Sequence, residues 1–127
     1  MRRSFSPGAI RPPFGRYHHA VSLQPPQKLL VVSGQLAVWP DGSVPEDVGE
    51  QTAVVLAAID ACLTGAGLGR GDVLRLSAFI TEPEYREPYM RARDAWVADP
   101  PPASTLLVVK ALALPACKVE IEAIAGR

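Results

Sequence analysis

Val119-Glu120-Ile121-Glu122-Ala123-Ile124-Ala125 is the stretch that decides the fold of this chain. Apolar and acidic side chains alternate at its start, so residues 118–124 are predicted to form a β-strand. Because side chains in a strand alternate between the two faces, Glu120 and Glu122 share one face. Carboxylates placed in this way form ion pairs or interface contacts, or act on a bound water as a general base.

Four more strands and two helices are predicted upstream of this strand. The strands cover residues 17–23, 29–33, 73–80 and 106–112, and the helices cover residues 45–66 and 82–98. The element order β-β-α-β-α-β-β argues for an α+β fold in which both helices pack on one face of one sheet. The other face carries many apolar residues too, and a partner subunit is the natural candidate to bury it.

The longer helix has clear signals at both ends. Pro45 suits the first helical position, and Glu46 and Asp47 favour the positive end of the helix dipole. Gly65 offers the C-terminal stop. A second helix follows the strand at residues 73–80, and Leu114-Pro115-Ala116-Cys117 joins the last two strands by a hairpin or a short crossing.

Residues 1–14 show no periodicity and are predicted to be an irregular N-terminal arm. Four arginines crowd this end of the chain, which suggests an anion-binding or targeting arm. A solvated tail is the favoured interpretation, because the prolines preclude a long amphipathic helix. The arginines are Arg2, Arg3, Arg11 and Arg16.

The composition fits one domain that spans residues 1–127. Thirteen basic and 13 acidic residues leave no net charge, which argues against a nucleic-acid partner. No apolar run approaches the about 18 residues that span a bilayer, and no signal peptide is visible. Cys62 and Cys117 make neither a disulfide framework nor a zinc signature, so a cytoplasmic protein with two thiols is expected.

Four short motifs carry a resemblance to a known family. They are Gly15-Arg16-Tyr17, Val32-Ser33-Gly34-Gln35, Pro102-Ala103-Ser104-Thr105 and the terminal strand. In this order and spacing they resemble the Rid family (RidA, YjgF), also labelled endoribonuclease L-PSP, from about Gly15 to Ala125. The resemblance implies a chorismate-mutase-like α+β fold, a mixed sheet with a barrel-like trimer core, and three small-molecule clefts at the subunit interfaces.

The resemblance also implies a set of cleft residues. In the enamine and imine deaminases of the family, the terminal Glu orients a water that attacks the imine carbon. An Arg in a Pro-Ala-Arg-Ser/Thr pattern holds the substrate carboxylate. Carried over by motif, the cleft residues are Tyr17, Gly34, the Ala103 position and Glu120.

The arginine position departs from the family pattern, because Ala103 occupies it. No arginine occurs between Arg93 and Arg127, and the only cations there are Lys110 and Lys118. A lysine supplies a point charge and cannot reproduce the planar fork of a guanidinium. Arg16, beside Tyr17, is a second candidate for an anion contact, and the alternative is that Arg16 is exposed to solvent.

The other polar candidates have simpler interpretations beside the functional ones. Glu120 is either a water-positioning general base or a carboxylate in an ion pair or interface. Tyr17 either bonds a ligand or closes an interface. His18 and His19 point to opposite faces of a strand and cannot readily chelate one metal, so neither a metal nor a cofactor is expected.

Three functions remain open at this point. The first is hydrolysis of a reactive enamine or imine without the carboxylate-binding Arg, with Glu120 as the catalytic residue. The second is a non-catalytic, trimeric metabolite-binding protein. Ala103, Leu106 and Leu107 make the cleft more apolar at the position where the deaminases carry the carboxylate-binding Arg. The third, an endoribonuclease or translation inhibitor, has the least support from the charge and the two adjacent histidines.

Overall fold

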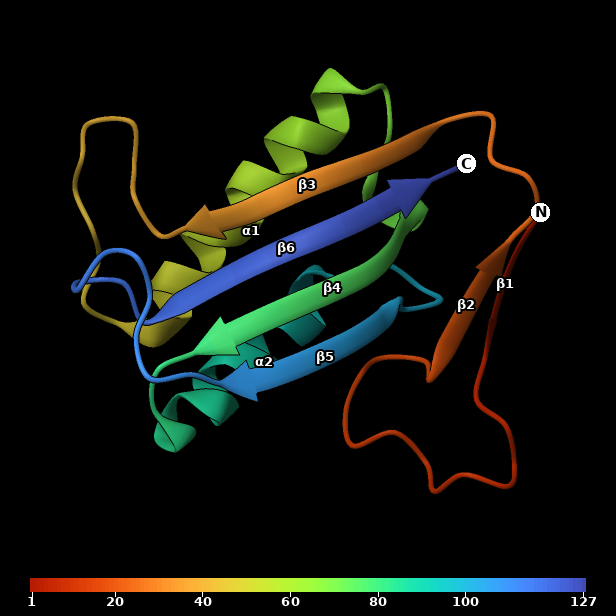
Figure 1. Cartoon of the computed structure of the whole chain (residues 1–127), viewed down its shortest axis with the longest axis horizontal. Coiled ribbons are helices and arrows are strands. Elements are labelled where there is room, and N and C mark those ends of the chain that lie inside the picture. Colours follow the sequence, from red (N-terminus) through yellow and green to blue (C-terminus); the bar gives the residue numbers. More distant parts are fainter.

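The computed structural model describes all residues from 1 to 127 (Figure 1). It shows a four-stranded mixed sheet with two helices on one face and a separate two-stranded sheet, so the prediction of a single sheet is wrong for the strand expected at residues 17–23. Short 3-10 turns occupy Arg70–Asp72 and Pro83–Tyr85. The strands are β1 (Arg2–Phe5), β2 (Ala20–Leu23), β3 (Leu29–Leu36), β4 (Val73–Ile80), β5 (Ala103–Val108) and β6 (Val119–Gly126), and the helices are α1 (Val48–Gly65) and α2 (Arg86–Trp96).

The main sheet has the strand order β3-β6-β4-β5. β6 runs antiparallel to both of its neighbours, and β5 runs parallel to β4. Parallel neighbours need a crossover connection, which α2 provides. β4 separates β5 from β6, so the segment between these two strands is a crossing and does not close a hairpin.

The two faces of β6 differ as the sequence predicts. Val119, Ile121, Ala123 and Ala125 are almost fully buried, which places them toward the helices. Glu120 and Glu122 occupy the opposite face, called the open face here because no element of the chain covers it. The α+β prediction with both helices on one face is therefore confirmed.

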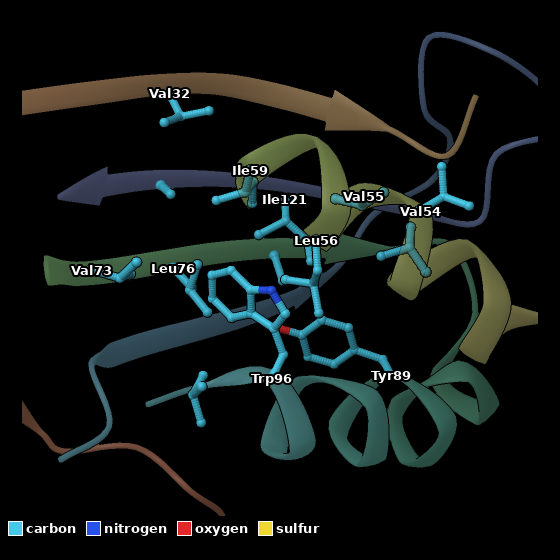
Figure 2. Packing of buried hydrophobic residues seen from close by; sticks show 14 of the residues in the cluster. Val32, Val54, Val55, Leu56, Ile59, Val73, Leu76, Tyr89, Trp96 and Ile121 are labelled. Atoms are coloured by element: carbon cyan, nitrogen blue, oxygen red, sulfur yellow. The ribbon is translucent and has the colours of Figure 1, made fainter. Parts of the chain in front are cut away.

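The core lies between the sheet and the two helices. Figure 2 shows Val55 and Ile59 of α1 beside Ile121 of β6, with Tyr89 and Trp96 of α2 below them. α1 is 18 residues long with a mean hydropathy of 1.2, which is enough by length and composition to cross a membrane. It packs on β3 and β6, so it is a core helix whose apolar character the sequence analysis understated.

The N-terminal arm is not wholly irregular. β1 pairs with β2 in antiparallel register from Arg2 opposite Leu23 to Phe5 opposite Ala20. Arg2 donates to the carbonyl oxygens of Gly71 and Pro100 instead of extending into solvent. The prediction of an irregular segment is thus wrong for β1, because a strand of four residues is too short to show a clear alternation of apolar and polar side chains.

Several element boundaries also differ from the prediction. The strand expected from Tyr17 begins at Ala20, and β5 runs from Ala103 to Val108 rather than from 106 to 112. α1 begins at Val48, because the Asp47 side chain caps it by accepting from the backbone N–H of Glu50 at 2.9 Å. α2 begins at Arg86, after the turn that contains Pro83.

Gln51 ties the start of α1 to the chain before β6. Its fully buried amide donates to the carbonyls of Pro45 at 2.7 Å and Ala116 at 3.0 Å, and it accepts from the N–H of Lys118 at 2.7 Å. We predict that Gln51→Leu lowers the free energy of unfolding by about 3 kcal/mol, because three backbone groups lose their partner. Urea denaturation checks this, with exposed Gln27→Leu as the control, and equal stability of both variants would contradict it.

Candidate functional site

Gly34 and Glu120 form the first part of the candidate site. Gly34 lies in β3 where the register with β6 shifts between Val32 and Gln35, which marks a bulge. A side chain at Gly34 would overlap a carboxylate oxygen of Glu120, and its Cβ would lie 2.9 Å from the Glu120 Cδ. Gly34 has no positive φ, so a side chain at this position would conflict only with the space that the flexible end of the Glu120 side chain occupies. The chain leaves this gap for the carboxylate.

We predict that Gly34→Ala displaces the Glu120 carboxylate and reduces any activity that depends on it by about tenfold or more. The fold should survive, because Glu120 is half-buried and its side chain can move toward solvent. Turnover and thermal unfolding should be measured on the same sample. A Gly34→Ala protein with unchanged turnover would show that the position of the carboxylate is unimportant.

Tyr17 and Ser104 form the second part, together with an arginine that the motif search missed. His18 bridges to Ala103 in parallel, and its N–H donates to the carbonyl of Pro102 at 2.9 Å. This pairing turns Tyr17 and Ser104 toward α2. There the guanidinium of Arg93 donates from Nη1 to the Ser104 Oγ at 3.2 Å and lies 5.8 Å from the centre of the Tyr17 ring.

The guanidinium of Arg93 is held firmly. Its side chain is only 3% exposed, and Nε and Nη2 donate to the Asp94 Oδ1 at 3.1 and 2.9 Å. The Tyr89 ring lies 5.5 Å from it on another side. A buried guanidinium with a carboxylate partner and two aromatic rings is fixed in place.

A cavity of about 310 Å³ opens beside this cluster between α2 and β5. Its lining combines apolar side chains with two arginines and two hydroxyls. The lining residues are Phe14, Tyr17, Ile80, Pro83, Arg86, Met90, Arg93, Ser104, Leu106 and Val108.

The third position of the Pro-Ala-Arg-Ser/Thr pattern falls on Ser104, so the assignment of the arginine position to Ala103 is wrong. Ala103 faces away from Tyr17. It lies opposite Arg75 of β4 on the open face, where Arg75 Nη2 donates to the Thr105 Oγ1 at 2.9 Å. The structure thus brings two arginines near Pro102-Ala103-Ser104-Thr105, Arg75 on one face and Arg93 on the other. Sequence analysis missed both because it searched only the segment after Arg93, whereas β4 and α2 approach β5 from earlier in the chain.

The other predicted cations lie elsewhere. Arg16 makes a long contact of 3.9 Å with the exposed Asp99 and does not line the cavity. Lys118 donates to the Glu46 carbonyl at 2.6 Å, and Lys110 is exposed after β5.

The ring of His18 forms a hydrogen bond with the Pro101 carbonyl through Nδ1 at 3.0 Å. Groups of three or more His, Cys, Asp or Glu side chains with metal-binding geometry do not occur.

The two parts of the site lie at opposite ends of the sheet. Glu120 is opposite Phe79, and Phe79 is opposite Leu107 of β5. Ala103 begins β5 four residues earlier, opposite Arg75. Two strand spacings and four residues therefore separate Glu120 from the Tyr17 cluster within one chain. A single copy does not bring the predicted cleft residues together.

Comparison with known proteins points to the same family as the four sequence motifs. The sequence profile described as Endoribonuclease L-PSP matches residues 9–126. The chain belongs to the Rid/YjgF family. TdcF of Escherichia coli K12, which carries the name reactive intermediate deaminase, is 35% identical over 128 residues that cover 96% of this chain and 92% of TdcF.

Solved structures of Rid proteins share the fold. YyfB from Yersinia pestis superposes with a TM-score of 0.86 at 34% identity, covering 99% of this chain and 98% of YyfB. YjgF from E. coli gives 0.73 at 27% identity, with 98% of each chain covered. TdcF with bound serine gives 0.68 at 33% identity and covers 96% of this chain and 93% of TdcF. The prediction of the family and of its mixed α+β fold is therefore confirmed.

Proposed function

We propose that this Rid protein hydrolyses a reactive enamine or imine in clefts formed between copies of the chain. The observation that carries the proposal is the gap at Gly34, which the Glu120 carboxylate fills. The similarity to TdcF supports the same reaction class.

The chemistry follows from the properties of a carboxylate. An ionised Glu120 only accepts hydrogen bonds, so it can hold a water and take its proton as the water oxygen bonds to the C=N carbon. The imine nitrogen gains a proton, and the carbinolamine then breaks its C–N bond. One imine and one water thus give a carbonyl compound and ammonia, with no redox step.

A second copy of the chain supplies what one copy lacks. The open face exposes Val31 at 70%, Leu29 at 60% and Leu107 at 51%, with Ile124 between the two edges. Apolar residues gathered on one face of a sheet mark an interface. We propose a homotrimer in which these faces form the barrel-like core, and in which Glu120 of one copy meets the Tyr17 cluster of the next.

A non-catalytic binding protein is the second candidate. The cavity beside Tyr17 is mainly apolar and its arginine is firmly held, which suits retention of a metabolite without turnover. The structure of TdcF with bound serine shows that a relative holds a small molecule.

Cys62 and Cys117 both carry free thiols. Thiols stay reduced in the cytoplasm, so we propose that the protein is cytoplasmic.

Release of keto acid and ammonia from freshly generated 2-imino acids tests the proposal. An amino-acid oxidase produces the imino acids from a panel of amino acids, and the protein is added in increasing amounts. Release should rise above the spontaneous rate in proportion to the protein. Tight binding of the products with no rise in release would favour the binding protein.

A further inference from the structure

The strands β1 and β2 and the segment 6–19 between them form a strap, residues 1–23, that contributes nothing to the hydrophobic core. Figure 1 shows these two strands beside the main sheet, and they pair only with each other. None of the strap side chains belongs to the core, and none is fully buried. A two-stranded sheet with no apolar face packed into a core is only marginally stable in water.

Hydrogen bonds hold the strap to the body of the protein at two residues. The Arg2 guanidinium donates to the carbonyls of Gly71 and Pro100, and His18 bonds the chain just before β5. Burial lowers the pKa of Arg2, although the nearby charge of Asp72 acts against this shift. Docking of the strap therefore takes a positive charge partly out of water, which costs free energy.

Buried polar atoms without a hydrogen-bond partner are concentrated in the strap. Five side-chain atoms of the chain are in this state, and four of them are Arg2 Nε, Ser4 Oγ and the two ring nitrogens of His19. Each of these atoms has given up contact with solvent and gained no partner within the chain, which destabilises the docked state. Because they are buried within one copy, a second copy cannot reach them while the strap is docked.

The segment 6–19 also forms part of the wall of the cavity between α2 and β5. Phe14 and Tyr17 line that cavity, and the backbone N–H of Phe14 donates to the Tyr17 hydroxyl at 3.2 Å. Between them, Gly15 lies so close to α2 that an added Cβ would be 2.7 Å from Met90 Cε and 2.9 Å from Arg93 Nη2. This part of the strap therefore closes the cavity by packing its backbone directly against α2.

We propose that the strap undocks from the body as one unit and that residues 6–19 are the lid of the cavity. When the strap is docked, Phe14 and Tyr17 complete the cavity wall. When it is undocked, the unpartnered polar atoms regain water and the side of α2 that carries Met90 is uncovered. The bonds of Arg2 and His18 favour the first state, and the burial of polar atoms favours the second. The inference goes beyond the proposed function, because it concerns access to the cavity and not the reaction.

Hydrogen–deuterium exchange of the full-length protein, followed by peptide mass spectrometry, measures the undocking. The strap should exchange as a unit and about 100-fold or more faster than β4 and β6, because its amides open without global unfolding. Arg2→Gln removes the charged donor to Gly71 and Pro100 and should speed this exchange by about tenfold, while β6 keeps its rate. Arg3→Gln is the matched control, since Arg3 is exposed and its guanidinium lies over the Phe5 ring of the same strand.

Oxidation of Met90 by hydrogen peroxide measures the opening of the cavity. The chain has two methionines, and Met1, which is 92% exposed, is the internal reference. Arg2→Gln should raise the oxidation rate of Met90 relative to Met1 by about tenfold, because susceptibility follows exposure. Ser4→Ala combined with His19→Phe replaces three unpartnered polar atoms by apolar groups, and it should slow both exchange and oxidation by about tenfold.

Three results would overturn the inference. They are strap exchange as slow as that of β6, equal effects of Arg2→Gln and Arg3→Gln, and faster strap exchange with unchanged oxidation of Met90. If Arg2→Gln does not fold, the Ser4→Ala, His19→Phe double variant decides, and unchanged exchange in that variant contradicts the inference. Neither measurement uses a substrate. Failure of the proposed hydrolysis would therefore leave the lid intact, and a strap that never undocks would leave the hydrolysis intact.

Discussion

Glu120→Gln is expected to lower the rate of imine hydrolysis by about 100-fold or more, because a neutral amide cannot accept the proton of the attacking water. The substitution keeps the size of the side chain and its fit against Gly34. The measurement is keto acid release from a 2-imino acid at equal protein concentrations, with thermal unfolding as a check on the fold.

Glu122→Gln is the matched control for this result. Glu122 lies two residues along β6 on the same open face, and it is more exposed than Glu120. It should retain nearly the full rate, since no gap in β3 is made for it. Equal loss in both variants would mean that the open face needs its charge and that Glu120 has no special role.

Val31→Glu together with Ile124→Glu is expected to convert the oligomer into monomers and to remove hydrolysis with it. These residues are paired across β3 and β6 and lie exposed on the open face. Like charges brought together at a closed interface repel each other. Burying the two added carboxylates of each chain makes the free energy of association less favourable by about 5 kcal/mol or more. Sedimentation velocity and turnover should change together.

Leu114→Glu is the control for the change of assembly state. Leu114 is 43% exposed in the loop between β5 and β6 and belongs to neither strand. Its replacement should change neither the sedimentation coefficient nor the rate. A Val31→Glu, Ile124→Glu double variant that sediments like the unchanged protein would place the subunit interface elsewhere.

The sequence predicted the parts of the fold that depend on local patterns. The strand at β4 matches the expected range of 73–80, and the alternation in β6 correctly separated the buried residues from Glu120. β1 was missed because it is only four residues long and shows no clear alternation of apolar and polar side chains. The start of α1 was placed too early, since Pro45 and Asp47 both resemble start signals and the Asp47 cap determines the start.

The candidate site was predictable only where its residues lie within motifs. Gly34 and Glu120 come from separate motifs, and the pairing of β3 with β6 brings them into contact. Arg93 carried no motif signal, because an arginine in an amphipathic helix usually faces solvent. Its burial depends on the packing of α2 against Ser104 and Tyr17, a contact between elements that sequence periodicity does not report.

The central claim is that each cleft takes Glu120 from one copy of the chain and the Tyr17 cluster from another. Co-assembly of Glu120→Gln chains with Tyr17→Ala chains tests it most directly, because each variant alone lacks one half of every cleft. After mixing in equal amounts, random assembly into a closed ring should restore about one quarter of the normal imine hydrolysis. A mixture no more active than its two components would contradict a site shared between copies.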